Sequence, residues 1–93
     1  MHIAQTRLSI ETAPREIKDI TAEIAQWTER QRISVGLLTL YIPHTSASLL
    51  IQENASPDVR RDLQLGSWQG VFLLEHRASP HRRSLVLTLI GED

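Results

Sequence analysis

The chain has no cysteine, few aromatic residues and almost no net charge. Without cysteine it forms no disulfide and performs no thiolate chemistry, which fits a cytoplasmic protein. A formal charge of −1 over 93 residues gives no electrostatic bias toward nucleic acid or an anionic membrane. No window approaches the roughly 18 apolar residues that a membrane-spanning helix needs, and we expect no signal peptide.

The hydrophobic content of 41% fits a single globular domain, because 93 residues are too few for two. A chain of this size buries only roughly 60–65% of its unfolded surface, so we expect it to associate.

Spacing of apolar residues organises the first third of the chain. Alternation over Ile3–Ile10 predicts a strand with Leu8 and Ile10 on one face. The proline of Thr12-Ala13-Pro14 is tolerated in a first helical turn, and it predicts that a helix begins there. An apolar stripe at helical spacing then predicts a helix from Pro14 to Arg30: Ile17, Ile20, Ile24 and Trp27.

The middle of the chain predicts two strands. Ile33–Ile42 is apolar on both alternating faces, which is typical of a strand covered on both sides. Pro43 ends it, and Ser46–Gln52 predicts a second strand. Its inward residues would be Ala47, Leu49 and Ile51.

The last third predicts a short helix and two more strands. Ser56-Pro57-Asp58 starts the helix with an acidic first turn, and Gly66 ends it. Ser67–Leu74 and Ser84–Ile90 predict the remaining strands. Strands and helices do not alternate regularly, so we expect an α+β domain, mostly antiparallel, with one long and one short helix.

The segment Ile42–Asn54 carries the most chemistry. His44 suits a general acid/base or a metal ligand, but a histidine after a strand can equally bond the backbone. Ser46 and Ser48 alternate with apolar residues, so both hydroxyls are expected on one face of the strand. They suit a phosphate oxygen if an arginine lies nearby, or they bond local carbonyls.

Other candidates lie further along the chain. Glu75 and His76 are adjacent on a predicted strand, so they point to opposite faces and can scarcely both bind one metal ion. Of the two, Glu75 is the better partner for His44 as a ligand of a divalent metal. Alternation likewise allows only one of Arg82 and Arg83 to face a pocket. With no row of aromatic residues, these arginines make a weak case for nucleic acid.

Two blocks, IPHTSASLLIQEN (42–54) and LGSWQGVFLLEHR (65–77), resemble the YjbQ family, whose members are often labelled secondary thiamine-phosphate synthase enzymes. The features that match extend in order over nearly the whole chain. They are His44 to Ser48, Glu53, Asn54, Pro57, Asp58, Arg60, Asp62, Gly66 to Gly70, Glu75, Arg82 and Arg83.

The resemblance implies coupling of a pyrimidine diphosphate to a thiazole phosphate with loss of diphosphate, in a homotrimer. His44 and Glu75 would be catalytic and would hold any divalent metal. Trp68 could stack on a flat substrate ring, although a buried core role is commoner. The substrate and its phosphates would contact Ser46, Ser48, Asn54, Trp68, Gln69, Arg82 and Arg83.

One departure from the family is large. Several dozen residues, including a paired-aspartate-and-histidine stretch, normally separate the short helix from the glycine-threonine-tryptophan-glutamine turn, and here Leu63 and Gln64 are adjacent. Either a segment of the protein is missing from this sequence between Leu63 and Gln64, which we favour, or the chain is a shortened relative. A shortened relative would favour a non-catalytic oligomeric protein that binds a small anion or metabolite. A metal-dependent phosphoester hydrolase is a third alternative.

Overall fold

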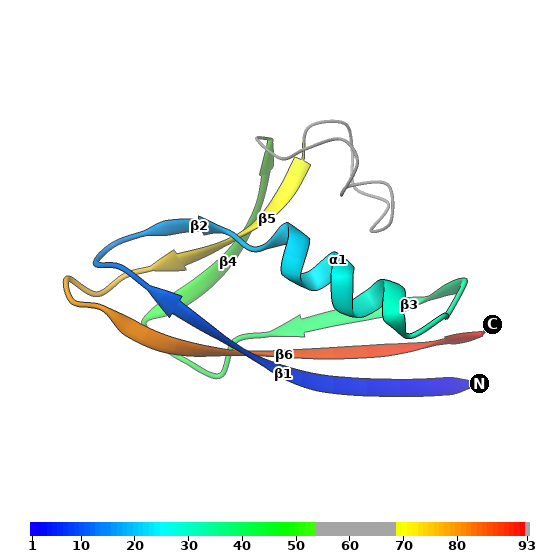
Figure 1. Ribbon diagram of the computed structural model, residues 1–93. Coiled ribbons are helices and arrows are strands. Elements are labelled where there is room, and N and C mark those ends of the chain that lie inside the picture. Colours follow the sequence, from blue (N-terminus) through cyan, green and yellow to red (C-terminus); the bar gives the residue numbers. More distant parts are fainter. Residues whose placement is uncertain (54–68, 93) are drawn as a thin grey trace.

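The computed structural model describes residues 1–53 and 69–92, which form two three-stranded antiparallel sheets and one helix (Figure 1). In chain order the elements are β1 (His2–Thr12), β2 (Ile17–Asp19), α1 (Thr21–Arg30), β3 (Val35–Tyr41), β4 (Ala47–Glu53), β5 (Gln69–Glu75) and β6 (His81–Glu92). The first sheet has the order β1-β6-β3 and the second the order β2-β5-β4. The expected α+β class with mostly antiparallel strands is confirmed.

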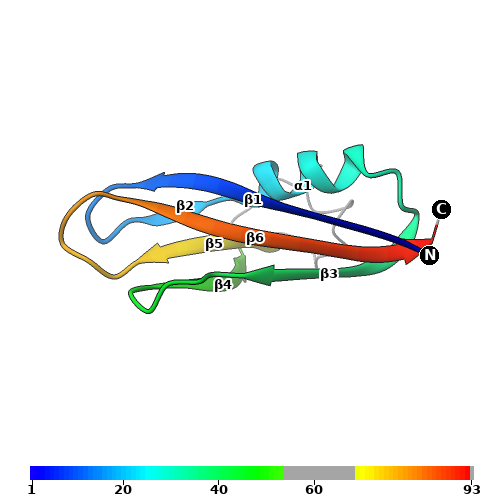
Figure 2. The ribbon, with the colours of Figure 1, turned by 90° about the horizontal axis from the view of Figure 1, so that it is seen from below.

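The long strand β6 is the centre of the first sheet, between β1 and β3 (Figure 2). The second sheet and α1 lie on the same side of this sheet (Figure 1). The core fills the space between these layers. Its buried residues are Ile10, Ile20, Ile24, Trp27, Ala47, Val71, Leu73, Leu85, Leu87 and Leu89.

The helix begins later than the sequence predicts. Pro14 lies instead in a turn closed by the bond from the Glu16 N–H to the Ala13 carbonyl (3.2 Å), and Ile17 belongs to β2, which pairs with β5. The carboxylate of Asp19 accepts bonds from the N–H (3.0 Å) and the hydroxyl (2.6 Å) of Thr21 at the start of α1. The prediction of a helix from Pro14 to Arg30 is therefore wrong in its first seven residues.

Strand β3 is covered on one face only. Leu38 and Leu40 pack against the core, whereas Val35, Leu37 and Tyr41 are 74%, 68% and 59% exposed. The prediction of cover on both sides is wrong for the isolated chain. On β4 the predicted inward side chain of Ile51 is also exposed.

The boundaries of the last strands differ from those predicted. Strand β5 ends one residue later, at Glu75, and β6 is longer at both ends. The predicted short helix and the joint between Leu63 and Gln64 lie outside the described residues. In the part of the chain that is described, no helix has the length and apolar character to cross a membrane.

Candidate functional site

A buried ion pair joins the two sheets at the end where β5 passes into β6. The side chains of Glu75 and Arg83 are 0% and 5% exposed. Arg83 donates from Nε to Glu75 Oε1 (2.7 Å) and from Nη2 to Glu75 Oε2 (2.5 Å). This two-point geometry is the strong form of an arginine–carboxylate contact.

Two further donors complete the shell of the Glu75 carboxylate. The Thr12 hydroxyl, from the end of β1, bonds to Oε1 (2.5 Å), and the Arg77 N–H bonds to Oε2 (3.0 Å). The hydrogen bonds from Arg83 hold the pKa of the Glu75 carboxyl well below its usual range, and those from Thr12 and the Arg77 amide act in the same direction. The carboxylate is therefore ionised, and both of its oxygens are already bonded.

Strand alternation decides which arginine turns inward. Arg83 shares its face of β6 with the buried Leu85 and Leu87, whereas Arg82 points outward and pairs with Glu11 (2.9 Å). The Arg83 guanidinium also donates to Ser46, at Oγ (2.9 Å) and at the carbonyl oxygen (3.2 Å). Arg83 thus ties β6 to β5 and to the residue just before β4.

His44 bonds to the backbone at the end of the first sheet. Its Nε2 accepts the N–H of Ser84 on β6 at 3.0 Å, just beyond the last β3–β6 pair, Tyr41 with Val86. The ring therefore continues a ladder that Pro43 interrupts. An acceptor at Nε2 leaves the proton of the neutral ring on Nδ1, which has no hydrogen-bond partner among residues 1–53 and 69–92.

Ser48 belongs to a separate polar group. Its Oγ lies 2.8 Å from His76 Nε2, and both side chains lie toward solvent. Ser46 instead contacts Arg83, so the prediction that the two hydroxyls share one face is wrong. Strand β4 begins only at Ala47, and alternation does not extend back to Ser46. The expectation that Glu75 and His76 point apart agrees with their separate partners.

Three predicted site residues are not placed by the structure. Asn54 and Trp68 lie outside the described residues. Gln69 begins β5, where its backbone pairs with Glu53, but its side chain is also outside the description. Their proposed contacts with substrate stay predictions.

The described contacts do not fit a cation held by His44 and Glu75. Arg83 occupies both oxygens of Glu75, and a metal at His44 Nε2 would displace the Ser84 amide. Within the described ranges no cluster of three or more His, Cys, Asp or Glu side chains is suited to a metal. The metal therefore stays a prediction, and we derive no chemical step from it.

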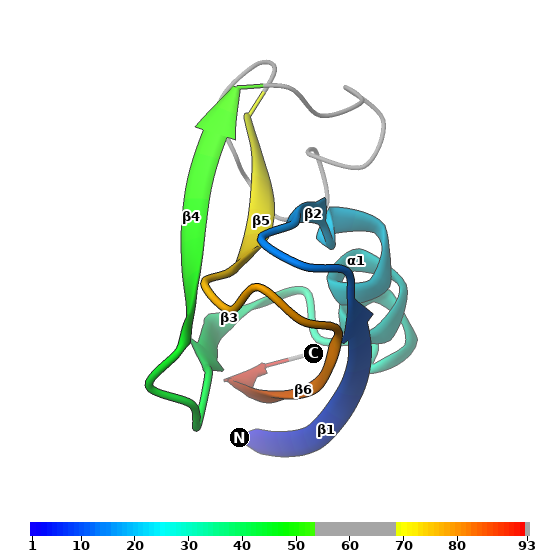
Figure 3. The same cartoon turned by 90° about the vertical axis from the view of Figure 1, so that its left-hand side faces the viewer.

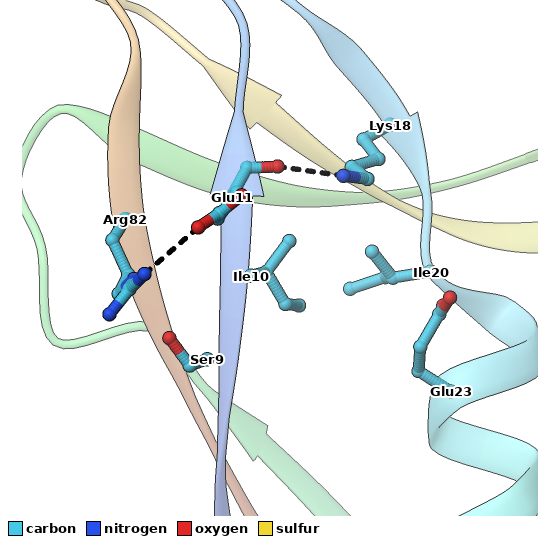
Figure 4. A pocket seen from close by; sticks show the side chains of 7 residues that line it. All are labelled: Ser9, Ile10, Glu11, Lys18, Ile20, Glu23 and Arg82. Atoms are coloured by element: carbon cyan, nitrogen blue, oxygen red, sulfur yellow. Dashed lines mark hydrogen bonds and ion pairs between the residues drawn. The ribbon is translucent and has the colours of Figure 1, made fainter.

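A surface hollow of about 520 Å³ lies between β1, β2 and α1, apart from the buried pair (Figure 4). Lys18 donates to the Glu11 carbonyl (2.7 Å) across it, and Arg82 contacts the Glu11 carboxylate. The hydrogen bond from Arg82 lowers the pKa of the Glu11 carboxyl. Of the charged side chains that line the hollow, Arg82 and Glu11 pair with each other, and Lys18 bonds to a backbone carbonyl.

The sequence contained a signal for two contacts that went unpredicted. Thr12 shares the inward face of β1 with Leu8 and Ile10, so a polar residue there needed a buried partner. Counting back in steps of two from the buried leucines of β6 places Arg83 inward as well. Nothing in the sequence indicated the bond from the Arg77 amide.

Comparison with known proteins identifies the family. A family profile described as "UPF0047 protein YjbQ-like" matches residues 6–64. The UPF0047 protein sll1880 of Synechocystis is 30% identical over 135 residues, covering 95% of this chain and 92% of the relative. The UPF0047 protein YugU of Bacillus subtilis is 39% identical over 75 residues, covering 80% of this chain and 56% of the relative. The chain belongs to the YjbQ (UPF0047) family.

Solved structures agree with the fold. A hypothetical protein of Aeropyrum pernix K1 superposes with a TM-score of 0.80 at 19% identity, covering 96% of this chain and 99% of that one. A YjbQ/UPF0047 family protein of Clostridium acetobutylicum gives 0.75 at 22% identity, covering 91% and 99%. At these identities the likeness supports the fold alone.

The alignment with the Synechocystis relative also bears on chain length. Its 135 positions exceed the 93 residues of this chain, so the relative carries residues with no counterpart here. That they fall between Leu63 and Gln64 stays a prediction.

Proposed function

We propose that this protein is a thiamine-phosphate synthase-type enzyme that joins a pyrimidine diphosphate to a thiazole phosphate with loss of diphosphate. The main support is family membership together with the polar network at the end of the two sheets. The departing diphosphate gathers negative charge, so the reaction needs fixed donors more than it needs a strong base. We propose that the reaction takes place in the cytoplasm. If thiamine-phosphate synthesis is a secondary activity, the natural substrate of the enzyme is a different molecule.

The contacts suggest a division of roles within this site. The ion pair of Glu75 and Arg83 holds Ser46, and with it the segment that carries His44 and Ser48. His44 offers an Nδ1–H, and Ser48 offers a hydroxyl that His76 can orient. In this proposal these two donors meet the phosphate oxygens, while Glu75 and Arg83 act as positioning residues.

The test is formation of thiamine phosphate by wild type, His44→Ala and His44→Gln, each with a divalent metal and with a chelator. The glutamine carbonyl can still accept the Ser84 N–H but cannot replace Nδ1–H, so it separates positioning from donation. We expect both variants to lose at least tenfold in rate while His44→Gln keeps the wild-type melting temperature. Full activity in His44→Gln would remove the imidazole from the mechanism.

The alternative is a non-catalytic protein that binds a small anion, and the same contacts are compatible with it because binding needs no base. The hydrogen-bonding atoms of Glu75 and the Nε2 of His44 are engaged within the fold, so no strong base is free among them. This alternative would be selected if the protein binds phosphate esters without turnover, even when any segment that belongs between Leu63 and Gln64 is present. Turnover of a phosphoester only with added metal would select the hydrolase.

We also propose self-association, as a homotrimer. On the outer face of the first sheet Ile3, Ile90 and Leu37 form a row across the three strands, and all three are exposed. Val35 and Tyr41 extend this apolar face. We propose that a second copy of the chain covers this apolar face, because the small chain alone leaves so much apolar surface exposed. Light scattering on a sizing column tests it: Leu37→Glu should yield monomers, and an unchanged mass would contradict it.

A further inference from the structure

Two loops far apart in the sequence meet at one end of the molecule. The turn between β1 and β2 and the loop between β5 and β6 lie side by side in Figure 3. The Arg15 N–H bonds to the Arg77 carbonyl (2.8 Å), and the Glu75 N–H bonds to the Glu16 carbonyl (2.8 Å). These backbone bonds fix the two loops against each other and bring Arg15 and Arg77 together in space.

This end gathers positive charge that the fold does not use. Arg15 and Arg77 are exposed, and within residues 1–53 and 69–92 neither guanidinium has an ion-pair or hydrogen-bond partner. The nearby histidines are engaged: His76 bonds to Ser48, and His81, which begins β6, bonds to the Ser79 carbonyl. We call Arg15 and Arg77 the cationic tip. It is a local gathering, since the whole chain carries a formal charge of −1.

The acidic groups near the tip are already engaged. Glu75 is bonded to Arg83, and Glu11 is paired with Arg82. Glu16, in the same turn as Arg15, accepts the Ala13 N–H at its Oε1 (2.9 Å). Within residues 1–53 and 69–92, the guanidinium groups of Arg15 and Arg77 are therefore open to a ligand, with Glu16 the one nearby carboxylate that no cation pairs.

The backbone of Arg15 adds an independent observation. Pro14 and Arg15 are the central residues of the turn from Ala13 to Glu16, and Arg15 has a φ of 52°. A positive φ at the second central position favours glycine or asparagine, and an arginine there is strained. Backbone strain of this kind clusters at functional sites, but Arg32 has a similar φ of 55°, so strain alone does not mark a site.

We propose that the cationic tip binds the diphosphate or a comparable oligophosphate group of a small-molecule ligand. Two guanidinium groups on fixed loops suit an anion with several oxygens, because each can donate paired hydrogen bonds. This inference deepens the proposed function. Phosphate binding at the tip does not depend on that function, but the identity of the rest of the ligand does. It also replaces Arg82 and Arg83, which are committed to glutamates, as the phosphate-binding arginines.

The structure offers a matched control for testing Arg15. Arg32 is exposed, has a φ of 55° and belongs to the connection from α1 to β3, which lies at the opposite end of the molecule from the β1–β2 turn (Figure 1). Glycine at either position should relieve backbone strain and raise the melting temperature. Only Arg15→Gly should weaken binding. A variant that becomes more stable while losing affinity cannot be explained by misfolding.

The experiment is calorimetric titration of inorganic pyrophosphate into wild type, Arg15→Gly, Arg77→Gln and Arg32→Gly at low salt. We expect Kd to rise about tenfold in Arg15→Gly and in Arg77→Gln, and to stay within about twofold in Arg32→Gly. Unchanged affinity in both tip variants would overturn the proposal. So would wild type that binds vesicles of phosphatidylserine and phosphatidylcholine but not pyrophosphate.

Failure of this proposal is distinguishable from failure of the proposed function. If the tip variants lose pyrophosphate affinity but wild type forms no thiamine phosphate, the anion site stands and the enzyme assignment fails. If wild type and both tip variants form thiamine phosphate with the same KM, the assignment stands and the tip proposal fails.

Discussion

Arg82 and Arg83 are neighbours on one strand, and each pairs with a glutamate, yet their surroundings are opposite. The outer pair, Arg82 with Glu11, has side chains that are 72% and 75% exposed. The inner pair, Arg83 with Glu75, is almost fully enclosed. An exposed ion pair adds little because water and salt screen it, whereas a buried one is costly to break because a charge is left uncompensated. Burial, not pairing, therefore decides what these contacts are worth.

Replacing Glu75 by glutamine should have the largest effect. The substitution keeps the shape but removes the negative charge beside the buried Arg83 guanidinium and places an amide among its donors. We expect the melting temperature to fall by roughly 10 °C or more. Circular dichroism on heating measures it, and a fall below about 3 °C would show that the inner pair resembles the outer one.

Thr12→Val should have an intermediate effect. It keeps the side-chain shape and removes the hydroxyl that bonds to Glu75 Oε1 and the His81 carbonyl. We expect a loss of about 1–2 kcal/mol in the free energy of unfolding, because the carboxylate keeps its other donors. Urea unfolding measures the loss. Thr12→Ser, which retains the hydroxyl, should recover most of it.

Acid should weaken the inner pair. The folded-state pKa of Glu75 lies below the ordinary value of 4.5, so its contribution is complete above that pH and is lost as the pH falls toward the folded-state pKa. From pH 7 to pH 3, the free energy of unfolding, measured with urea, should fall more in wild type than in Glu75→Gln. Equal losses would mean that other carboxyls account for the acid sensitivity.

The smallest effect is expected for Glu11→Gln at the outer pair. Because both partners are exposed, the melting temperature should change by no more than about 2 °C at moderate salt. Differential scanning fluorimetry at low and high salt is sufficient. A large, salt-independent fall would contradict the contrast with the inner pair.

Local periodicity predicted much of the fold. Alternation located β1, β4, β5 and β6, and the spacing of Ile20, Ile24 and Trp27 located the body of α1. It failed where a non-local contact decides. Ile17 has the spacing of a helical stripe, but its segment pairs with β5 instead. Pro14 suits both a turn and a helix start, and only tertiary structure selects between them.

The candidate site was predicted in part. Motifs indicated His44, Ser46, Glu75 and the arginine pair, and the structure joins Ser46, Glu75 and Arg83 in one network. They did not indicate that Glu75 would be enclosed by Arg83 and Thr12, because those contacts depend on how two sheets pack. The proposed role of Arg15 was not predicted either, since its φ cannot be read from the sequence.

The most direct measurement is a pair of double-mutant cycles by urea unfolding, one on Glu75 and Arg83 and the other on Glu11 and Arg82. Matched changes of Glu to Gln and Arg to Met in both cycles give the coupling free energy of each pair. The coupling of the inner pair should be several times that of the outer pair and should persist in high salt. Equal couplings, or an inner coupling that salt abolishes, would contradict the central claim that the enclosed pair locks the two sheets together.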